Sequence, residues 1–288
     1  MENTEKNRLE KSTLYLVGTP IGNLADMSER VKKTLTEADF IAAEDTRNAL
    51  KLCSILGIKK EVVSYFEHNK KASGEKIVKR LLSGECCALV TDAGMPAISD
   101  PGEDIVRLCA EYGITVSAVP GPCAAISALA LSALSTARFA FEGFLPAQKS
   151  DRRRRLTALQ KEDRTLIFYE APHKLRATLS DMAEIFGKER KISLCRELTK
   201  LNEEVIRTTL EGAVMKYTDS EPRGEYVLVV EGADASAVQS EEKLELISLS
   251  PEEHVSHYIE LGMERMDAIK AAAKDRGLSK SEMYKLLI

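Results

Sequence analysis

Short apolar runs that alternate with longer amphipathic runs are the feature that most constrains the fold of this chain. Gly57, Gly84 and Gly113 directly follow amphipathic runs, where the left-handed cap of a helix is expected. Short apolar strands separated by helices favour a mostly parallel sheet covered on both faces. The strand-like runs lie at 14–17, 40–43, 62–65, 86–90 and 114–118, and the helix-like runs at 28–38, 47–56, 73–82, 103–112 and 124–134. We therefore predict an α/β domain over residues 12–135.

The second half of the chain has fewer helices, and its neighbouring strands can pair antiparallel. Strand-like runs lie at 138–144, 165–169, 191–195, 203–209 and 225–230, with a charged stretch through Lys161, a helix at 173–186 and one further short helix between them. This pattern predicts a second α/β domain over residues 136–233. Residues 234–250 are polar and are predicted to be a linker. Apolar spacing in residues 251–288 predicts three short helices that form a small appendage with a helix-turn-helix pattern.

Composition indicates a soluble globular protein with room for two main domains. The chain has 288 residues, of which 44% are hydrophobic, and its net charge is −4, so a polyanionic partner would need a local basic patch. The six cysteines form no C-x-x-C pair and no cysteine–histidine cluster, so we expect reduced core thiols and no metal site. We find no secretory leader and no apolar run near the ~20 residues that span a bilayer. We expect a cytoplasmic protein without a membrane partner.

Three loops that follow predicted strands are the candidate ligand-binding segments. They are GTPIGN at 18–23, TDAGMPAISDPG at 91–102 and VPGPCAA at 119–125. Ligands of a parallel sheet collect at the carboxyl ends of its strands, and glycine and proline there expose backbone groups that a ligand can approach. We expect the three loops to meet at one site.

The first loop does not match the glycine loops that bind phosphate. A Walker loop needs lysine and a hydroxyl residue after its last glycine, but Gly22 is followed by Asn23 and Leu24. The glycine spacing is G-x-x-x-G, which differs from the dinucleotide pattern, and Pro20 removes one amide donor. The loop suits a ligand recognised by its shape and by a few carbonyls better than it suits a triphosphate.

Eight stretches of the chain resemble the tetrapyrrole methylase superfamily, the class III methyltransferases that use S-adenosylmethionine. The stretches are LYLVGTPIGNLADMS, AAEDTR, TDAGMPAISDPG, VPGPCAA, FEGFLPAQKSDRRRRL, FYEAPHKL, CRELTK and RGEYVLVVEG, in order from residue 14 to residue 232. Within the superfamily, the sequence is similar to the bacterial branch that 2′-O-methylates a cytidine in the decoding region of 16S rRNA, in the 30S ribosomal subunit. The resemblance implies a two-domain α/β fold with the cofactor between the domains, commonly in a homodimer.

The same resemblance implies which residues bind S-adenosylmethionine. They are Pro20 in the first loop, Asp92, Gly94, Met95 and Ile98 in the second, Cys123 and Ala124 in the third, and Tyr169 with Glu170 from the second domain. Tetrapyrrole enzymes carry G-D-P where this chain has AGMP at residues 93–96, so Asp92 or backbone alone replaces an acidic contact there.

Methyl transfer to a ribose hydroxyl needs alignment, a dry cleft and removal of a proton, because the cofactor already holds an activated methyl group. The candidate proton acceptors are Glu170 and Glu197, with Lys200 or Arg196 as the electrostatic partner. Glu170 has cofactor binding as its alternative role. EDTR at residues 44–47 is either a helix cap with a salt bridge or a substrate contact, and the sequence leaves both open.

A local excess of basic residues predicts the RNA-binding surface. Residues 145–164 hold seven lysines and arginines against three acids. The RNA-binding candidates among them are Lys149, Arg152, Arg153, Arg154 and Arg155. A solvated helix face is the alternative. The basic residues of the C-terminal helices could add a second RNA contact.

Two other functions fit the same sequence. One is a methyltransferase of the same fold that acts on a tetrapyrrole or on a protein, since arginines also bind carboxylates. The other is a noncatalytic RNA-binding protein of ribosome assembly, which would not respond to S-adenosylmethionine.

Overall fold

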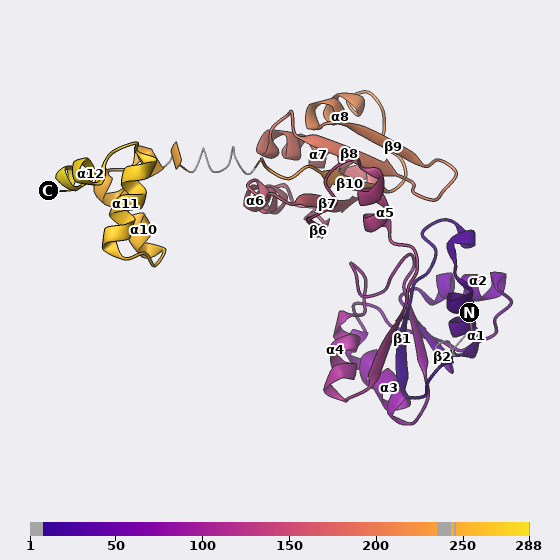
Figure 1. Ribbon diagram of the computed structural model, residues 1–288. Coiled ribbons are helices and arrows are strands. Elements are labelled where there is room, and N and C mark those ends of the chain that lie inside the picture. The colour runs from indigo at the N-terminus through magenta and orange to yellow at the C-terminus, as the bar shows by residue number, and fades with distance from the viewer. Residues whose placement is uncertain (1–7, 235–242, 245, 288) are drawn as a thin grey trace, which may run out of the picture. The chain divides into compact units, whose positions relative to one another are not determined.

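The computed structural model describes residues 8–234, 243–244 and 246–287 (Figure 1). The chain forms two compact units. One comprises Met1–Leu156 with Thr165–Glu231 and contains two β-sheets, and the other comprises Thr157–Arg164 with Gly232–Ile288. No described helix combines the length and apolar character needed to cross a membrane.

The first sheet has five parallel strands in the order β3-β2-β4-β1-β5. The strands are β1 (Thr13–Val17), β2 (Phe40–Ala43), β3 (Val62–Ser64), β4 (Cys87–Val90) and β5 (Thr115–Val119). The helices between them are the short 3-10 helix η1 (Leu24–Asp26), α1 (Glu29–Glu37), α2 (Thr46–Ile55), α3 (Lys70–Leu82) and α4 (Glu103–Glu111). The parallel α/β arrangement predicted for this half is confirmed.

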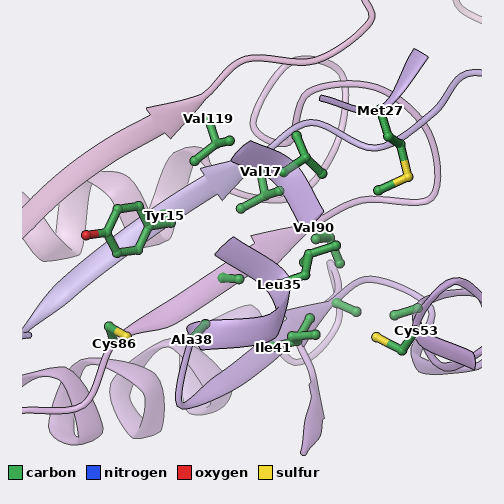
Figure 2. Close-up of a cluster of buried hydrophobic side chains, with 14 residues drawn as sticks. Tyr15, Val17, Met27, Leu35, Ala38, Ile41, Cys53, Cys86, Val90 and Val119 are labelled. Atoms are coloured by element: carbon green, nitrogen blue, oxygen red, sulfur yellow. The ribbon is translucent and has the colours of Figure 1, made fainter. Parts of the chain in front are cut away.

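Alternate residues of each strand enter two different cores, because successive side chains point to opposite faces of a sheet. Tyr15, Val17 and Ile41 pack with Leu35 of α1 and Cys53 of α2 on one face (Figure 2). The other face buries Leu14, Phe40, Ala42, Cys87 and Leu89 against Ile77, Val78 and Leu81 of α3 and Ile105 and Cys109 of α4. Both faces of the sheet are therefore covered by helices, which accounts for the fully buried β2 and β4.

The second sheet is mixed and has the order β6-β7-β10-β8-β9. Its strands are β6 (Phe139–Phe144), β7 (Thr165–Glu170), β8 (Lys191–Arg196), β9 (Glu204–Thr209) and β10 (Tyr226–Val230). Only β6 and β7 pair in parallel, and the other pairs are antiparallel. The accompanying helices are α6 (Lys149–Leu159), α7 (Pro172–Phe186) and α8 (Leu210–Lys216).

Helix α5 (Ala124–Leu131) differs from the expectation that it completes the first domain. Its buried residues Ala125, Ala128 and Leu129 pack against Ile167 of β7 and Val229 of β10, which belong to the second sheet. Small alanine side chains let a helix approach a sheet closely, since they have little volume to accommodate. The chain therefore passes to the second sheet near the end of the third loop, at residue 124.

The C-terminal unit contains the predicted helices α10 (Pro251–Glu260), α11 (Arg265–Asp275) and α12 (Lys280–Leu286). They share a core of Val255, Ala268, Ile269, Ala272, Ala273 and Met283. Ser250 and Ser279 each begin a helix with a reciprocal capping box, to Glu253 and Glu282. Most of the predicted linker, residues 235–242 and 245, lies outside the described residues.

Candidate cofactor cavity and nucleic-acid contacts

A cavity of about 510 Å³ lies where the three predicted loops meet. From the loops it is lined by Ile21, residues 92–95, residues 98–100, Cys123 and Ala124. Residues at or next to the ends of strands of the second sheet line the rest, namely Phe144, residues 169–172, Cys195, Glu197, Leu198, Lys200 and residues 225–227. Carboxyl ends of parallel strands thus supply one wall, as expected for a ligand site in such a sheet.

Backbone hydrogen bonds hold the three loops together. The amides of Thr19 and Gly94 donate to each other's carbonyl oxygens, at 2.9 and 3.1 Å. The Gly18 amide donates to the Val119 carbonyl at 3.0 Å. A Cβ atom on Gly18 would lie 2.6 Å from the Cα of Gly121, so no larger residue fits there without displacing the third loop. The glycines therefore serve close packing of the loops as well as access for a ligand.

The loops on both sides of the cavity contain residues other than glycine with positive φ angles. Ala97 and Ser99 have φ values of 70° and 63° in the second loop, and Glu197 and Thr199 have values of 51° and 66° after β8. Such conformations are unfavourable for residues with a side chain and are typical of functional sites.

Most of the residues predicted to bind the cofactor line this cavity. They are Asp92, Gly94, Met95, Ile98, Cys123, Ala124 and Tyr169. Pro20 lies instead in an adjoining recess with Asn48 and Lys51 of α2. The Tyr169 ring packs edge-on against Phe141 and Phe144, with centroids 5.0 and 5.5 Å apart, and burial raises the pKa of its hydroxyl to about 12. Tyr169 therefore remains protonated at neutral pH.

Asp100 is a cavity residue that the sequence analysis did not single out, although it lies within the quoted second loop. Burial raises the pKa of its carboxyl to about 6, with a further contribution from the charge of Glu44 and opposition from a hydrogen bond to Thr91. The only sequence signal for Asp100 was its position in that loop. Its burial beside other carboxylates became apparent only in the fold.

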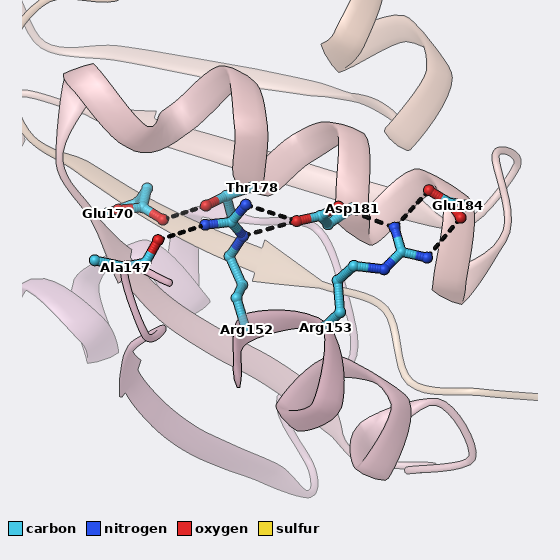
Figure 3. Close-up of polar contacts among 7 residues, drawn as sticks. All are labelled: Ala147, Arg152, Arg153, Glu170, Thr178, Asp181 and Glu184. Atoms are coloured by element: carbon cyan, nitrogen blue, oxygen red, sulfur yellow. Dashed lines mark hydrogen bonds and ion pairs between the residues drawn. The ribbon is translucent and has the colours of Figure 1, made fainter. Parts of the chain in front are cut away.

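Glu170 is the last residue of β7, and both of its carboxylate oxygens accept hydrogen bonds from the segment that begins α7. One oxygen accepts from the Ala171 amide at 2.8 Å. The other accepts from the Thr178 hydroxyl at 2.5 Å (Figure 3). The residue is 2% exposed. These contacts fit a carboxylate that fixes the start of α7 better than one that exchanges protons with a substrate.

Glu197 and Lys200 form an ion pair in the cavity wall. The Lys200 ammonium lies 2.9 Å from Glu197 and 2.7 Å from Glu225, and the same Glu197 oxygen accepts from the Glu225 amide at 2.9 Å. Burial raises the pKa of Glu197, but the hydrogen bonds from Lys200 and the Glu225 amide outweigh it and leave the pKa below its usual value. Burial lowers the pKa of Lys200, but the two carboxylates outweigh it and raise the pKa overall. Both groups are charged at neutral pH.

Arg196 does not belong to the cavity lining, because its side chain turns to β9. Its Nε atom lies 3.2 Å from Glu204. Of the four predicted catalytic residues, the fold therefore brings Glu170, Glu197 and Lys200 to the cavity and pairs Arg196 with another strand.

The chemistry of the cavity fits S-adenosylmethionine. Asp92, Asp100 and Glu197 place carboxylates around a ligand that carries a positively charged sulfur and an ammonium group. Met95, Ile98, Ala124, Leu198 and Val227 supply apolar surface for the adenine ring. In the described part of the chain, no group of three His, Cys, Asp or Glu side chains is arranged to hold a metal ion.

The predicted RNA-binding arginines lie on α6, and two of them bind α7 instead of facing solvent (Figure 3). Arg152 is 5% exposed, its Nε atom donates to Asp181 at 2.8 Å, and it also donates to the Ala147 carbonyl at 3.1 Å. Arg153 contacts the second Asp181 oxygen at 3.0 Å and forms a two-point ion pair with Glu184. This placement differs from the expectation for Arg152, because a buried guanidinium that is already paired is not available to a phosphate.

The other three basic residues of α6 remain on the surface. Lys149 and Arg154 are exposed, and Arg154 pairs with Asp151 of its own helix, at 2.9 Å. Arg155 is half-exposed and pairs with Glu142 of β6. The predicted run thus divides into a structural pair, Arg152 and Arg153, and a surface set, Lys149, Arg154 and Arg155.

Comparisons with known proteins agree with this geometry. The sequence profile of the family described as Tetrapyrrole (Corrin/Porphyrin) Methylases matches residues 13–214. The chain is 49% identical over 281 residues to ribosomal RNA small subunit methyltransferase I of Halalkalibacterium halodurans, covering 98% of this chain and 96% of that protein. It is 45% identical over 221 residues to the protein of that name from Thermotoga maritima, covering 77% of this chain and 99% of that one.

The fold is also similar to solved structures. The crystal structure of diphthine synthase superposes with a TM-score of 0.59 at 15% identity, covering 76% of this chain and 90% of that chain. Uroporphyrin-III-C-methyltransferase from Thermus thermophilus superposes with a TM-score of 0.55 at 20% identity, covering 76% and 94%. These likenesses concern the fold.

Proposed function

The chain belongs to the tetrapyrrole (corrin/porphyrin) methylase family, and on this premise we propose that it methylates small-subunit ribosomal RNA. Its cofactor is S-adenosylmethionine, the methyl donor of this family. The observation that carries the proposal is the single cavity in which all three loops, carboxylates and apolar surface meet, in a chain that matches an rRNA methyltransferase over nearly its full length.

The finer proposal is a 2′-O-methylation of a cytidine ribose in the decoding region of 16S rRNA, carried out in the cytoplasm by a homodimer. It is supported by the eight sequence stretches that resemble that branch of the family. The acidic net charge of −4 supports an RNA contact that is local, at the surface set on α6, and not spread over the molecule.

In this proposal, the cavity residues bind the donor and align it. Asp92 and Asp100 hold its charged and hydroxyl groups, and Tyr169 and Ile98 exclude water from one wall. The bound donor supplies an activated methyl group, so the protein needs only to orient it and to assist loss of the hydroxyl proton, which passes to solvent water.

Lys200 is the group proposed to stabilise the developing alkoxide of the acceptor. Its ammonium is held in the cavity wall by Glu197 and Glu225, and its raised pKa keeps it charged. A fixed cation at the position where negative charge develops lowers the barrier without reorganisation. Glu197 then acts through Lys200 as a positioning residue, and Glu170 positions the start of α7.

The test combines cofactor binding with methyl transfer. We expect calorimetry to detect S-adenosylmethionine binding, and labelled methyl to appear in 30S subunits from cells that lack the protein but not in a tetrapyrrole precursor. Nucleoside mass spectrometry then identifies the modified position. The absence of a heat of binding would contradict the proposed methyltransferase activity. Labelling of the tetrapyrrole alone would favour a tetrapyrrole substrate over rRNA.

The variant Lys200→Met tests the proposed alkoxide contact. We expect kcat to fall about 100-fold, the loss typical of removing one stabilising donor, with partial rescue in Lys200→Arg. Lys188→Met is the matched control, because Lys188 forms an exposed ion pair with Glu211 and does not line the cavity. An unchanged kcat in Lys200→Met would exclude this role.

A further inference from the structure

A second recess of about 410 Å³ lies at the same edge of the first sheet as the cofactor cavity. It is lined by residues 44–47 after β2, by Ser64 and Phe66 at and after the end of β3, and by Asp92 after β4. These are the carboxyl ends of three neighbouring strands, since the sheet order begins β3-β2-β4.

The recess and the cavity share a wall. The cavity takes its first-sheet residues from the loops after β4, β1 and β5, which are the last three strands in the sheet order. Asp92 follows β4, the strand common to both sets, and lines both spaces. The Thr91 hydroxyl beside it donates to Glu44 of the recess at 3.0 Å. The edge of one sheet therefore presents two adjacent ligand spaces, as a transfer between two bound molecules requires.

We propose that this recess is the subsite for the acceptor nucleotide, and that it selects a base carrying an exocyclic amino group. The proposal rests on the function proposed above and names the part of the site that reads the RNA. It also decides between the two interpretations of EDTR left open by the sequence, in favour of a substrate contact in addition to a helix cap.

Carboxylates on the recess wall explain the preference for an amino group. Glu44 and Asp92 can accept hydrogen bonds from the amino group of cytosine. Uracil presents a carbonyl oxygen at the same position, which two carboxylates would repel. Thr91 fixes the orientation of Glu44, so this acceptor is positioned before RNA binds.

Phe66 and Arg47 supply the two other contacts that a nucleotide needs. Phe66 is 37% exposed and lines the recess, which leaves ring surface for a base to stack on. The Arg47 side chain is 88% exposed. Its Nε atom donates to Asp45 at 3.0 Å, and its backbone amide donates to the same Asp45 oxygen at 2.8 Å, which also caps α2.

This anchored arginine lies at the rim, where it can contact a backbone phosphate. The hydrogen bonds from Arg47 lower the pKa of Asp45 to about 2, so the pair remains ionised at neutral pH. The carboxylates inside would repel a phosphate. The arrangement therefore admits the base and keeps the backbone outside.

The test compares two recess variants with two matched controls in methyl transfer to unmodified 30S subunits. We expect Phe66→Ala to lower kcat/KM at least tenfold, mainly through KM, because a stacking surface is lost. We expect Glu44→Gln to reduce the preference for the target cytidine over a uridine substituted at that position about tenfold. Tyr112→Ala, an exposed aromatic before β5 at the opposite edge, and Glu67→Gln, an exposed acid outside the recess wall beside Phe66, should behave like wild type.

Calorimetry with S-adenosylmethionine separates this proposal from the proposed function. If wild type binds no donor or transfers no methyl group to the subunits, the proposed function fails. If wild type is active and both recess variants match their controls in KM and base preference, the subsite is wrongly assigned. A recess variant that folds normally but binds the donor several-fold more weakly also contradicts it, because its residue then serves the cofactor cavity.

Discussion

At the scale of single residues, Asp100 shows how a binding site can oppose stability. Its folded pKa of about 6 lies above the ordinary aspartate value of 3.8, so the folded state favours the protonated form. The free energy of unfolding then decreases as pH rises from about 4 to about 6, because the unfolded chain releases its proton first. We predict that Asp100→Asn raises the free energy of unfolding by about 1–2 kcal/mol at pH 7, and that this gain disappears toward pH 4. Urea unfolding at the two pH values measures it.

The same substitution should weaken S-adenosylmethionine binding, because one of the carboxylates that line the cavity is lost. Asp104→Asn is the control for the stability effect, since the hydrogen bond from Lys70 lowers the pKa of Asp104 and its removal should bring no gain. Equal stability of Asp100→Asn and wild type at pH 7 would show that burial of the Asp100 carboxylate does not destabilise the folded state. Such a trade between stability and activity is common at binding sites.

At the scale of elements, α6 is held to α7 by buried charge. Among the residues that the structure describes, removing Arg152 would leave the buried Asp181 with Arg153 as its one ion-pair partner, at 3.0 Å. A buried carboxylate that loses its main partner destabilises a fold strongly, so we predict that Arg152→Ala lowers the free energy of unfolding by about 3 kcal/mol. Arg154→Ala, two residues away on the exposed side, should change it by less than about 0.5 kcal/mol. Denaturant unfolding compares the two variants.

The surface set on α6 should behave in the opposite way. We predict that Lys149→Ala with Arg154→Ala weakens RNA binding and reduces the salt dependence of that binding by about 1–2 in logarithmic slope, while donor affinity stays constant. Filter binding over a range of salt concentrations measures this. An unchanged slope would show that the surface set does not bind RNA and forms a solvated helix face, the alternative that the sequence left open.

At the scale of the whole molecule, the C-terminal helices and the residues of the cofactor cavity belong to different compact units. In the sequence, the cavity residues fall between Ile21 and Val227. The Thermotoga maritima relative matches over 99% of its own length and covers 77% of this chain. We predict that a chain ending at residue 234 keeps its S-adenosylmethionine affinity within about twofold, because no cavity contact is removed. Calorimetry checks this, and a loss of binding would show that the helices support the cavity.

The sequence by itself determined the order of helices, strands and loops along this chain. The run at 40–43 is strand β2 as predicted, and the order of strands, loops and helices in both halves follows from apolar spacing and from glycines after helices. These signals are local, because they depend on residues within a few positions of one another. The three loops could also be named in advance, since each directly follows a strand of a parallel sheet.

Only the tertiary structure decided which of the named residues share a site. Helix α6 has just Leu156 and Leu159 as buried apolar residues, so its charged sequence indicated neither its packing nor the burial of Arg152 against Asp181, about thirty positions away. The same holds for Arg196, which pairs across to β9, and for the recess that joins the ends of three strands. Burial and partners depend on contacts between distant segments, and no spacing within one segment specifies them.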